Sequence, residues 1–583
     1  MSGRPLLRIG GVLLLVGAAL LPRAWYDALP WGPEMPPQTI KGVTLFQLSL
    51  ALEGLLLLWL STGSQLFRAL TPDHRPTLAG PIDDPTLDQR RAAWILGAIT
   101  ALALALRLFH VDSDLWLDEI APVMDYGRMS VLEVIASYQR SNNHLLNTLA
   151  VKASVALFGE REWAIRLPAL LVGTATVPAL YWVARMMQPR RAALGAAALL
   201  TVSYHHIFFS QNARGYAGYM LFALLSSGFL VRGLREDRWR DWLLYVVTLY
   251  LGFAFQLLTT FVAVAHGLVG LAALVSLRLE GRAASPLLGR LAGVFSVAGL
   301  LVFQLYACII PQALIVARTT YAAPATGFRP FSLEFALEMV RGISAGFGTG
   351  LLLGAIPFLL IGAVGFFVLL RRQWAIAAAL VLPEVVTAII FLARGFTFSP
   401  RFFLLALPLA MVCAVQGLWS LSELLTRRSP HRERLASRLA MSLVLILCAV
   451  SALSLRAYYA FPKQDYRGAI RFIESVRRSS DEVVVFGIAE KGIRFYVARE
   501  GVPDDARYNY VRTEKALDSV VTSHPGVRLL FAATFMRDIR INYPALYTTL
   551  RSDWPPPHVF PGTVGDGAVM VWTRPDSGTR ATR

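Results

Sequence analysis

The sequence predicts a polytopic α-helical membrane protein of about 13 transmembrane helices with a small C-terminal α/β domain on the extracytoplasmic side. Of its 583 residues, 55% are hydrophobic and only 16% are charged, whereas about 25% of the residues in soluble proteins are charged. Apolar runs of eighteen or more residues recur as far as residue 456, and a helix of that length can span a bilayer. Beyond residue 457 the composition changes to short segments typical of an α/β domain.

The distribution of basic residues indicates a membrane orientation and excludes a nucleic-acid partner. Lys and Arg number 56 against 38 Asp and Glu, a formal net charge of +18, but they lie between the apolar runs. That pattern is typical of cytoplasmic loops held against an anionic leaflet, so membrane lipid is the expected partner. The three cysteines, Cys308, Cys413 and Cys448, lie in apolar stretches, which favours packing over a disulfide or a zinc site.

The transmembrane helices are placed from the apolar runs and their flanking charges. The first run, after Arg4 and Arg8, has no small-residue cleavage site before Pro22, so we expect an uncleaved span rather than a signal peptide. With a cytoplasmic N-terminus, nearly every basic cluster falls in an inside loop. This predicts a multi-pass protein of the cell inner (plasma) membrane. The expected helix centres lie near residues 16, 53, 100, 176, 200, 223, 250, 269, 299, 358, 384, 411 and 446.

These spans divide the chain into three parts. We expect two helices and a cytoplasmic loop in residues 1–91 and a membrane domain in residues 92–456. Residues 457–583 follow an odd-numbered span and should form an extracytoplasmic domain. In that domain DYRGAIRFIESV predicts an amphipathic helix, and DEVVVFGI, RFYVA, VRLLFAA and AVMVWT predict short strands.

Four carboxylates follow the third span, in the segment DSDLWLDEIAP. They are Asp112, Asp114, Asp118 and Glu119, and such a group is unusual at the membrane exit of so uncharged a chain. An ionised carboxylate there could act as a general base toward an acceptor hydroxyl. The alternative is a helix start, in which an Asp caps the first turn and the acids favour the positive end of the helix dipole.

Two further outer segments carry hydrogen-bonding side chains. In SNNHLLNT, Asn143 and His144 are candidates for binding a substrate, although a lone His is more often a capping or interfacial residue. In FFSQNARGYAGY, Arg214 offers a planar fork for a phosphate, with Gln211 and Tyr216 beside it for hydroxyls. Snorkelling of the arginine to anionic headgroups is the alternative for that segment.

A last outer segment, RGFTFSPRFF, brackets a short loop with Arg394 and Arg401, which could hold a phosphate of an amphiphilic ligand. No P-loop, GxGxxG, HExxH or GxSxG element with suitable surroundings occurs in the sequence. An outer-surface reaction therefore needs a substrate that is activated inside and carried across, as a lipid phosphate can be. No cofactor and no metal are expected, because an acidic pair alone is a poor cage for a cation.

The order of these motifs resembles the bacterial family 39 glycosyltransferases, relatives of the protein O-mannosyltransferases and of the aminoarabinose transferase that acts on lipid A. The resemblance covers roughly residues 92–500. It differs at Asn212, where the family usually has Glu, and at His144 and Leu145, where PPL-like residues are usual. The matching segments are LWLDE, NNHLLN, FGEREWAIRLPALL, SQNARGYA, SPRFFLLALPL and QDYRGAIRFI.

The resemblance implies a GT-C fold and a polyprenyl-phosphate sugar as donor. By position it implies that Asp118 is the general base with Glu119 as its partner, and that Arg214 and Arg401 contact the donor phosphate. The implied reaction is transfer of a hexosyl or pentosyl group, with inversion, to a hydroxyl of a glycan, lipid or protein acceptor at the outer face. A flippase or transporter of a lipid-linked saccharide, and a membrane scaffold for the C-terminal domain, remain open alternatives.

Overall fold

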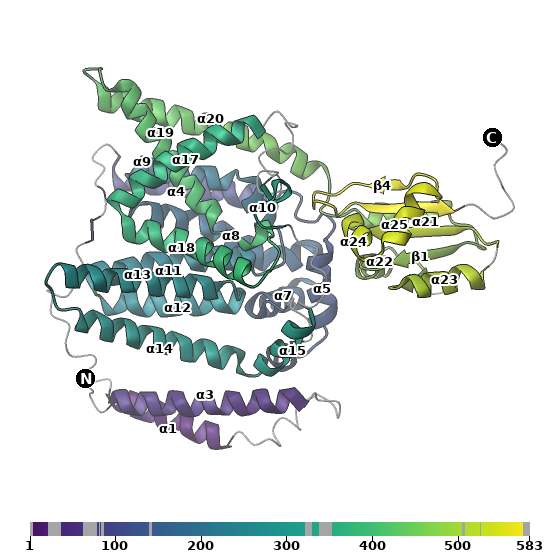
Figure 1. Cartoon of the computed structure of the whole chain (residues 1–583), viewed down its shortest axis with the longest axis horizontal. Coiled ribbons are helices and arrows are strands. Elements are labelled where there is room, and N and C mark those ends of the chain that lie inside the picture. The colour runs from purple at the N-terminus through teal and green to yellow at the C-terminus, as the bar shows by residue number, and fades with distance from the viewer. Residues whose placement is uncertain are drawn as a thin grey trace.

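Long apolar helices make up most of the chain, and a small α/β domain follows them (Figure 1). The computed structural model describes residues 4–20, 37–61, 78–80, 82, 87–138, 143–320, 329–336, 352–503, 508–524 and 526–574. Most of the cytoplasmic loop expected within residues 63–91 lies outside these described residues.

The helical part begins with a pair, α1 (Arg4–Leu20) and α3 (Pro37–Ser61), which pack against each other, and α3 also packs against α14 (Figure 1). The helices of the main bundle are α4 (Gln89–Leu108), α8 (Glu162–Ala184), α9 (Arg190–Thr201), α11 (Tyr216–Glu236), α12 (Trp239–Phe255), α13 (Thr259–Leu279), α14 (Ser285–Ala307), α17 (Leu352–Arg372), α18 (Trp374–Ala393), α19 (Ala406–Thr426) and α20 (Arg432–Ala460), and the shorter α15 spans Ile310–Thr320. The short ones are α5 (Leu117–Tyr126), α6 (Val131–Ala136), α7 (Leu145–Phe158), α10 (Tyr204–Ser210) and η4 (Pro400–Phe402).

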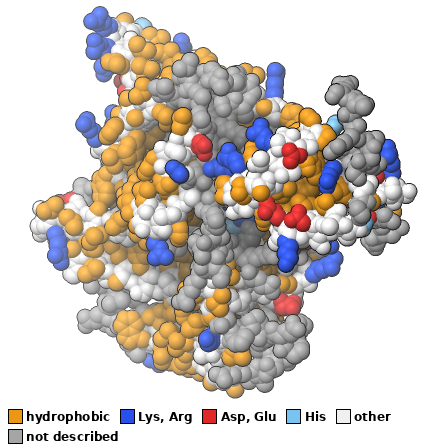
Figure 2. All heavy atoms as spheres, turned by 45° about the vertical axis from the view of Figure 1, so that its right-hand side comes forward, with side chains coloured by type: hydrophobic (Ala, Val, Ile, Leu, Met, Phe, Trp, Pro, Cys, Tyr) orange, Lys and Arg blue, Asp and Glu red, His pale blue; other side chains and the backbone are white. Residues whose placement is uncertain are grey.

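Each of the thirteen expected helix centres falls inside a helix of the structure. Within the described residues, nine helices are long and apolar enough to cross a membrane, or ten if the bent pair α9 and α10, which meet at 63°, counts as one span. The polytopic helical fold is therefore confirmed, whereas the number of about 13 crossings stays a prediction. Hydrophobic side chains dominate the visible flank of the helical part (Figure 2).

Small residues let neighbouring helices approach closely, as is common in membrane bundles. At the crossing of α17 and α19, a Cβ on Gly365 would lie 1.9 Å from the carbonyl oxygen of Cys413, and one on Gly417 would lie 1.9 Å from that of Ile361. Neither position can hold a side chain unless the two backbones separate. One turn earlier on α17, a Cβ on Gly362 would meet no atom within 4 Å.

The C-terminal part is an α/β domain, as predicted, with one mixed five-stranded sheet of order β2-β1-β3-β5-β4. β2, β1 and β3 are parallel, while β5 runs antiparallel to β3 and to β4. The strands are β1 (Glu482–Phe486), β2 (Tyr508–Val511), β3 (Leu529–Thr534), β4 (His558–Phe560) and β5 (Val569–Arg574). The helices are α21 (Tyr466–Val476), α22 (Ala489–Val497), α23 (Glu514–Ser523), α24 (Met536–Asn542) and α25 (Pro544–Ser552).

Three of the four expected strands correspond to β1, β3 and β5, and the expected amphipathic helix is α21. The strand expected at RFYVA is wrong, because this segment lies at the end of α22. Ala489, Gly492, Ile493 and Tyr496 are buried on one face of that helix at helical spacing. A short apolar run cannot distinguish a strand from a buried helix by periodicity alone.

The α/β domain lies at the end of the helical part that carries α5 and α7 (Figure 1). α22 packs directly on α5. Leu115 and Ile120, beside and within α5, share one apolar core with Ile470 of α21 and Ile493 of α22. The segment from Leu115 to Ile120, which contains Asp118 and Glu119, therefore lies between the two domains.

The close approach at Gly365 predicts a stability difference between two glycines of one helix. Gly365→Ala should destabilise the protein by about 1–3 kcal/mol, because the added methyl group forces α17 and α19 apart. Gly362→Ala should cause no loss. Thermal unfolding of both variants in detergent checks this, and equal midpoints for the two would contradict the packing described.

Candidate active site

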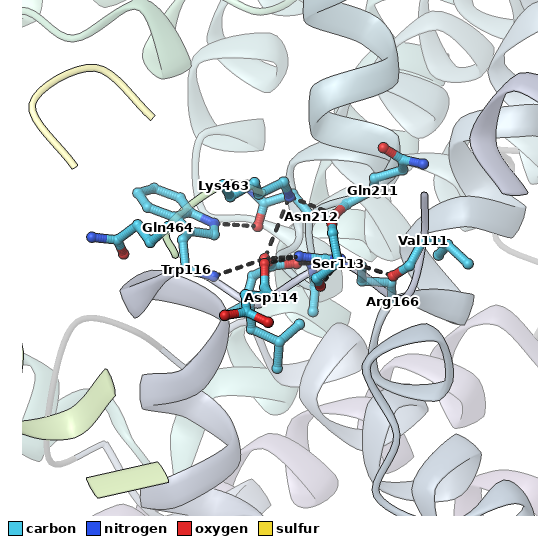
Figure 3. A network of polar contacts seen from close by, with 12 residues as sticks. Val111, Ser113, Asp114, Trp116, Arg166, Gln211, Asn212, Lys463 and Gln464 are labelled. Carbon is cyan, nitrogen blue, oxygen red and sulfur yellow. Dashed lines mark hydrogen bonds and ion pairs between the residues drawn. The ribbon is translucent and has the colours of Figure 1, made fainter. Parts of the chain in front are cut away.

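Arg166 of α8 fixes the loop between α4 and α5. Its guanidinium donates from Nη1 to the carbonyl oxygens of Val111 and Ser113, at 2.8 and 2.7 Å, and from Nη2 to that of Asp114 at 2.9 Å. The side chain is 1% exposed. Three carbonyls of one short loop therefore converge on a single buried arginine (Figure 3).

Glu119 is the anion that this arginine faces. Its carboxylate accepts two bonds from Arg166, Nε to Oε1 at 2.9 Å and Nη2 to Oε2 at 2.8 Å. The backbone N–H of Ala213 donates to Oε1 at 3.0 Å, and Lys463 Nζ lies 3.4 Å from Oε2. The side chain is fully buried. Both oxygens of Glu119 are therefore engaged by the protein.

The pKa values of this cluster follow from its burial and charges. Burial alone would raise the pKa of Glu119, but the charges of Arg166 and Lys463 outweigh it and lower the pKa to about 2. Burial lowers the pKa of Lys463 to about 7, because attraction to Glu119 compensates only in part and Arg166 repels it. Glu119 is thus ionised, between the Arg166 guanidinium and the Lys463 amino group, whose positive charge is lost as the pH rises through about 7.

Asp118, the preceding residue, points to a different set of groups. Its Oδ2 lies 3.0 Å from Nη1 of Arg401 on η4 and 3.4 Å from Nη1 of Arg214, which lies between α10 and α11. Arg214 also donates to the Asp118 carbonyl oxygen at 3.2 Å. The Asp118 side chain is 24% exposed. Successive residues of a helix point about 100° apart, so the two neighbouring acids occupy different environments.

His144 and Tyr216 lie beside these arginines. The His144 ring centre is 5.6 Å from that of Tyr216, and the Arg214 guanidinium lies 5.7 Å above the Tyr216 ring. Burial, and next the charges of Arg214 and Arg401, hold the pKa of His144 well below its usual value. The imidazole is therefore neutral, and among the described residues its buried Nε2 has no hydrogen-bond partner.

A glycine permits this approach at the start of α11. A Cβ on Gly215 would lie 1.9 Å from the carbonyl oxygen of Phe255 and 3.2 Å from Cβ of His144. Any side chain at this position would push Phe255 and His144 away from Arg214. Close packing thus requires the glycine of the RGY sequence.

Gln211 was expected to bind substrate, but the structure places it elsewhere. Its side-chain amide nitrogen donates to the carbonyl oxygens of Arg107 and Phe109, at 2.8 and 2.7 Å, and its Oε1 accepts from the Tyr458 hydroxyl at 2.7 Å. The residue is 2% exposed. Gln211 therefore joins the ends of α4 and α20, and among the described residues it has no hydrogen bond with Asp118, Arg214 or Arg401.

Among the described residues, neither Asn143 nor Arg394 has a hydrogen bond or ion pair with Asp118, Arg214 or Arg401. The Asn143 amide nitrogen donates to the carbonyl oxygens of Val134 and Ser137, at 3.0 and 3.1 Å, where α6 ends. Arg394 is exposed at the end of α18 and has no ion pair with Asp118 among the described residues. Residues 141 and 142 of the same motif lie outside the described ranges.

Sequence reasoning missed Arg166 and Lys463. An arginine inside a helix as apolar as α8 does carry a signal, because a charge at membrane depth needs a partner. Lys463 lies in an ordinary linker sequence, and only its contact across 344 positions with Glu119 reveals it. Within the described ranges no three His, Cys, Asp or Glu side chains group as a metal site, so no metal ligand set is assigned there.

Comparison with known proteins finds a family match and several similar folds. Residues 145–307 match the family model of dolichyl-phosphate-mannose-protein mannosyltransferases. The apo structure of ArnT from Cupriavidus metallidurans is similar at a TM-score of 0.50 and 12% identity, covering 82% of this chain and 97% of that one. No curated protein sequence matches the chain.

Two further structures are similar at a TM-score of 0.49. One is the same ArnT bound to undecaprenyl phosphate, with 13% identity over 83% of this chain and 98% of that one. The other is the apo oligosaccharyltransferase of Archaeoglobus fulgidus, with 11% identity over 82% of this chain and 74% of that one.

The two neighbouring acids should differ in their effect on stability. Glu119→Gln should destabilise the protein by about 3–5 kcal/mol, because Arg166 and Lys463 would be left buried without their anion. Asp118→Asn should cost less than about 1 kcal/mol, since solvent reaches its ion pairs. Thermal unfolding in detergent measures both, and a larger loss for Asp118→Asn would refute this assignment.

Proposed function

We propose that this chain is a GT-C glycosyltransferase, similar to the protein mannosyltransferases and ArnT, and that it transfers a sugar from a polyprenyl-phosphate donor to an acceptor hydroxyl. The observation that carries the proposal is the partly exposed carboxylate of Asp118 held between Arg214 and Arg401. A base and two phosphate-binding cations within one contact distance are what this transfer requires. The matched family, whose description names a dolichyl-phosphate sugar, supports the donor class.

In the proposed reaction Asp118 acts as general base. It accepts the proton of the acceptor hydroxyl while that oxygen attacks C1 of the donor sugar. The new C1–O bond forms as the bond from C1 to the phosphate oxygen breaks, with inversion at C1. The lipid phosphate leaves with both electrons of that bond, and Arg214 and Arg401 stabilise its charge.

The ion pairs of Asp118 describe the site before the donor binds. Arg401 is 39% exposed in its side chain and Arg214 only 5%, so Arg401 is the more accessible to an entering phosphate. A phosphate bound between them would compete with Asp118 for the guanidiniums. Its binding would release Oδ2 of Asp118 at the moment when a base is needed.

His144 and Tyr216 are proposed to contact the substrate. A neutral imidazole with an unpartnered, buried Nε2 can accept a hydrogen bond from a sugar hydroxyl. Glu119, in contrast, is proposed as a positioning residue, because both of its oxygens are occupied by Arg166, Lys463 and backbone. The reacting groups would thus be Asp118 and the two arginines.

The setting of the reaction follows from the expected topology. We propose a multi-pass protein of the plasma membrane whose active site and C-terminal domain face outward. The donor carries a hexosyl or pentosyl group, and the acceptor is a glycan, a lipid or a protein. The chain's own residues supply the base and the cations, so the proposed mechanism routes no step through a cofactor.

Asp118→Asn should lower the turnover number for release of polyprenyl phosphate by about 100- to 10,000-fold, since it removes the general base. Donor binding should be retained, because both arginines remain. The assay supplies the purified protein in nanodiscs with a panel of polyprenyl-phosphate sugars and membrane extract as the acceptor source. Asp112→Asn is the matched control, because Asp112 lies exposed in the same loop.

Two outcomes would contradict the proposal. One is release that is equally fast in wild type and Asp118→Asn. The other is seen with the protein reconstituted in sealed vesicles. If an intact lipid-linked sugar crosses the vesicle membrane without any bond being broken, the flippase alternative would be favoured.

Substitutions of Arg401 and of Arg394 should differ in their effect on the donor KM in the same assay. Arg401→Gln should raise the donor KM about 10- to 100-fold, because a charge-assisted contact to phosphate contributes about 1.5–3 kcal/mol. Arg394→Gln should change it less than about twofold, since Arg394 has no described contact with Asp118. Titration of donor binding for both variants checks this, and equal losses would place Arg394 in the phosphate site after all.

A further inference from the structure

The α/β domain makes polar contacts along the whole loop that carries Asp118. The backbone N–H of Leu115 donates to the Tyr496 hydroxyl at 2.7 Å, and that of Leu117 donates to Gln464 Oε1 at 2.7 Å. These two amides have their partners in residues more than 340 positions away. The backbone on either side of Trp116 is thus held by the C-terminal part of the chain.

Side-chain ion pairs also fix both ends of the segment from Asp114 to Asp125. The Asp114 carboxylate accepts from the backbone N–H and the guanidinium of Arg467, at 2.9 and 2.8 Å. At the end of α5, Lys491 of α22 lies 2.6 Å from both oxygens of Asp125. The two ends of this segment are therefore fixed to two different helices of the α/β domain, α21 and α22.

Gln464 connects the loop to the sheet itself. While its Oε1 accepts from Leu117, its Nε2 donates to the Thr534 hydroxyl and the Gly567 carbonyl oxygen, at 3.1 and 2.9 Å. Thr534 ends β3, and Gly567 precedes β5. A displacement of the sheet would therefore displace the backbone next to Asp118.

Lys463 precedes Gln464 in the linker between α20 and α21. Its side chain is 2% exposed, and its ammonium group donates to the carbonyl oxygen of Gln211 (Figure 3). The same group lies 3.4 Å from Oε2 of Glu119. It also lies 4.8 Å above the Phe208 ring. Glu119 therefore has one cation from the membrane domain, Arg166, and one from the linker to the α/β domain.

We propose that the α/β domain positions the catalytic loop, with Lys463, Gln464 and Tyr496 as positioning residues that hold the backbone around Asp118. This inference rests on the proposed function for its effect on turnover, but not for its effect on the loop. Asp118 itself is bound from the other side, by Arg214 and Arg401 of the membrane domain. The loop is thus fixed between two domains, with its base directed at one of them.

The test compares two tyrosines of the full-length protein in nanodiscs. Tyr496→Phe removes only the hydroxyl that accepts from Leu115. Tyr508→Phe is the matched control, because its hydroxyl donates to Glu474 inside the α/β domain, at 2.9 Å. Lys463→Met and Lys463→Arg form a second pair, in which only the first loses the positive charge.

Two readouts separate positioning from general stability. Hydrogen–deuterium exchange of peptides spanning residues 112–126 should become at least tenfold faster in Tyr496→Phe and in Lys463→Met. Turnover in the polyprenyl-phosphate assay should fall at least fivefold, with the donor KM within twofold of wild type. Tyr508→Phe should match wild type in both readouts, and Lys463→Arg should recover most of the loss.

Unchanged exchange in both Tyr496→Phe and Lys463→Met would overturn the proposal, as would faster exchange with undiminished turnover. If the wild type releases no polyprenyl phosphate from any donor, the proposed function fails instead. The exchange measurement then decides alone whether the α/β domain holds the loop.

Discussion

Glu119 and Arg166 form an ion pair with almost no exposed surface, immediately beside the partly exposed carboxylate of Asp118. Removing two such charges from water costs several kcal/mol for each ion unless hydrogen bonds satisfy them. Here they do: the arginine also binds three loop carbonyls, and the carboxylate also binds the amide of Ala213. The pair therefore determines the path of the chain from α4 into α5. Because breaking either half would leave an unpaired buried charge, the path has little freedom.

That constraint explains how two adjacent acids can perform different tasks. The helical turn of α5 directs Glu119 inward to the cluster and Asp118 outward to Arg214 and Arg401. In the proposed mechanism, stability and reactivity are thus assigned to neighbouring side chains of one short helix. The α/β domain contributes to the first task through Lys463, so the membrane domain alone does not complete the charge balance around Glu119.

Much of this could be predicted from the sequence. Long apolar runs located the helices, and short apolar runs rich in Val and aromatic residues located β1, β3 and β5, because both patterns are local. The order of motifs brought out Asp118, Arg214 and Arg401, which the structure does gather. Side-chain direction was not predictable: Gln211 and Asn143 lie in the same motifs, yet their amides bind helix ends. Lys463 was beyond reach, since its importance depends on a contact with Glu119 that no local pattern encodes.

The central claim is that the base and the phosphate-binding cations share one site while the Glu119 cluster only supports it. A structure of the full chain with polyprenyl phosphate bound tests this most directly. We expect phosphate oxygens within hydrogen-bond distance of Arg214 and Arg401, Asp118 released from both, and the bonds between Glu119 and Arg166 unchanged. A phosphate bound away from these arginines, or bound to Arg166 at the expense of Glu119, would contradict the account.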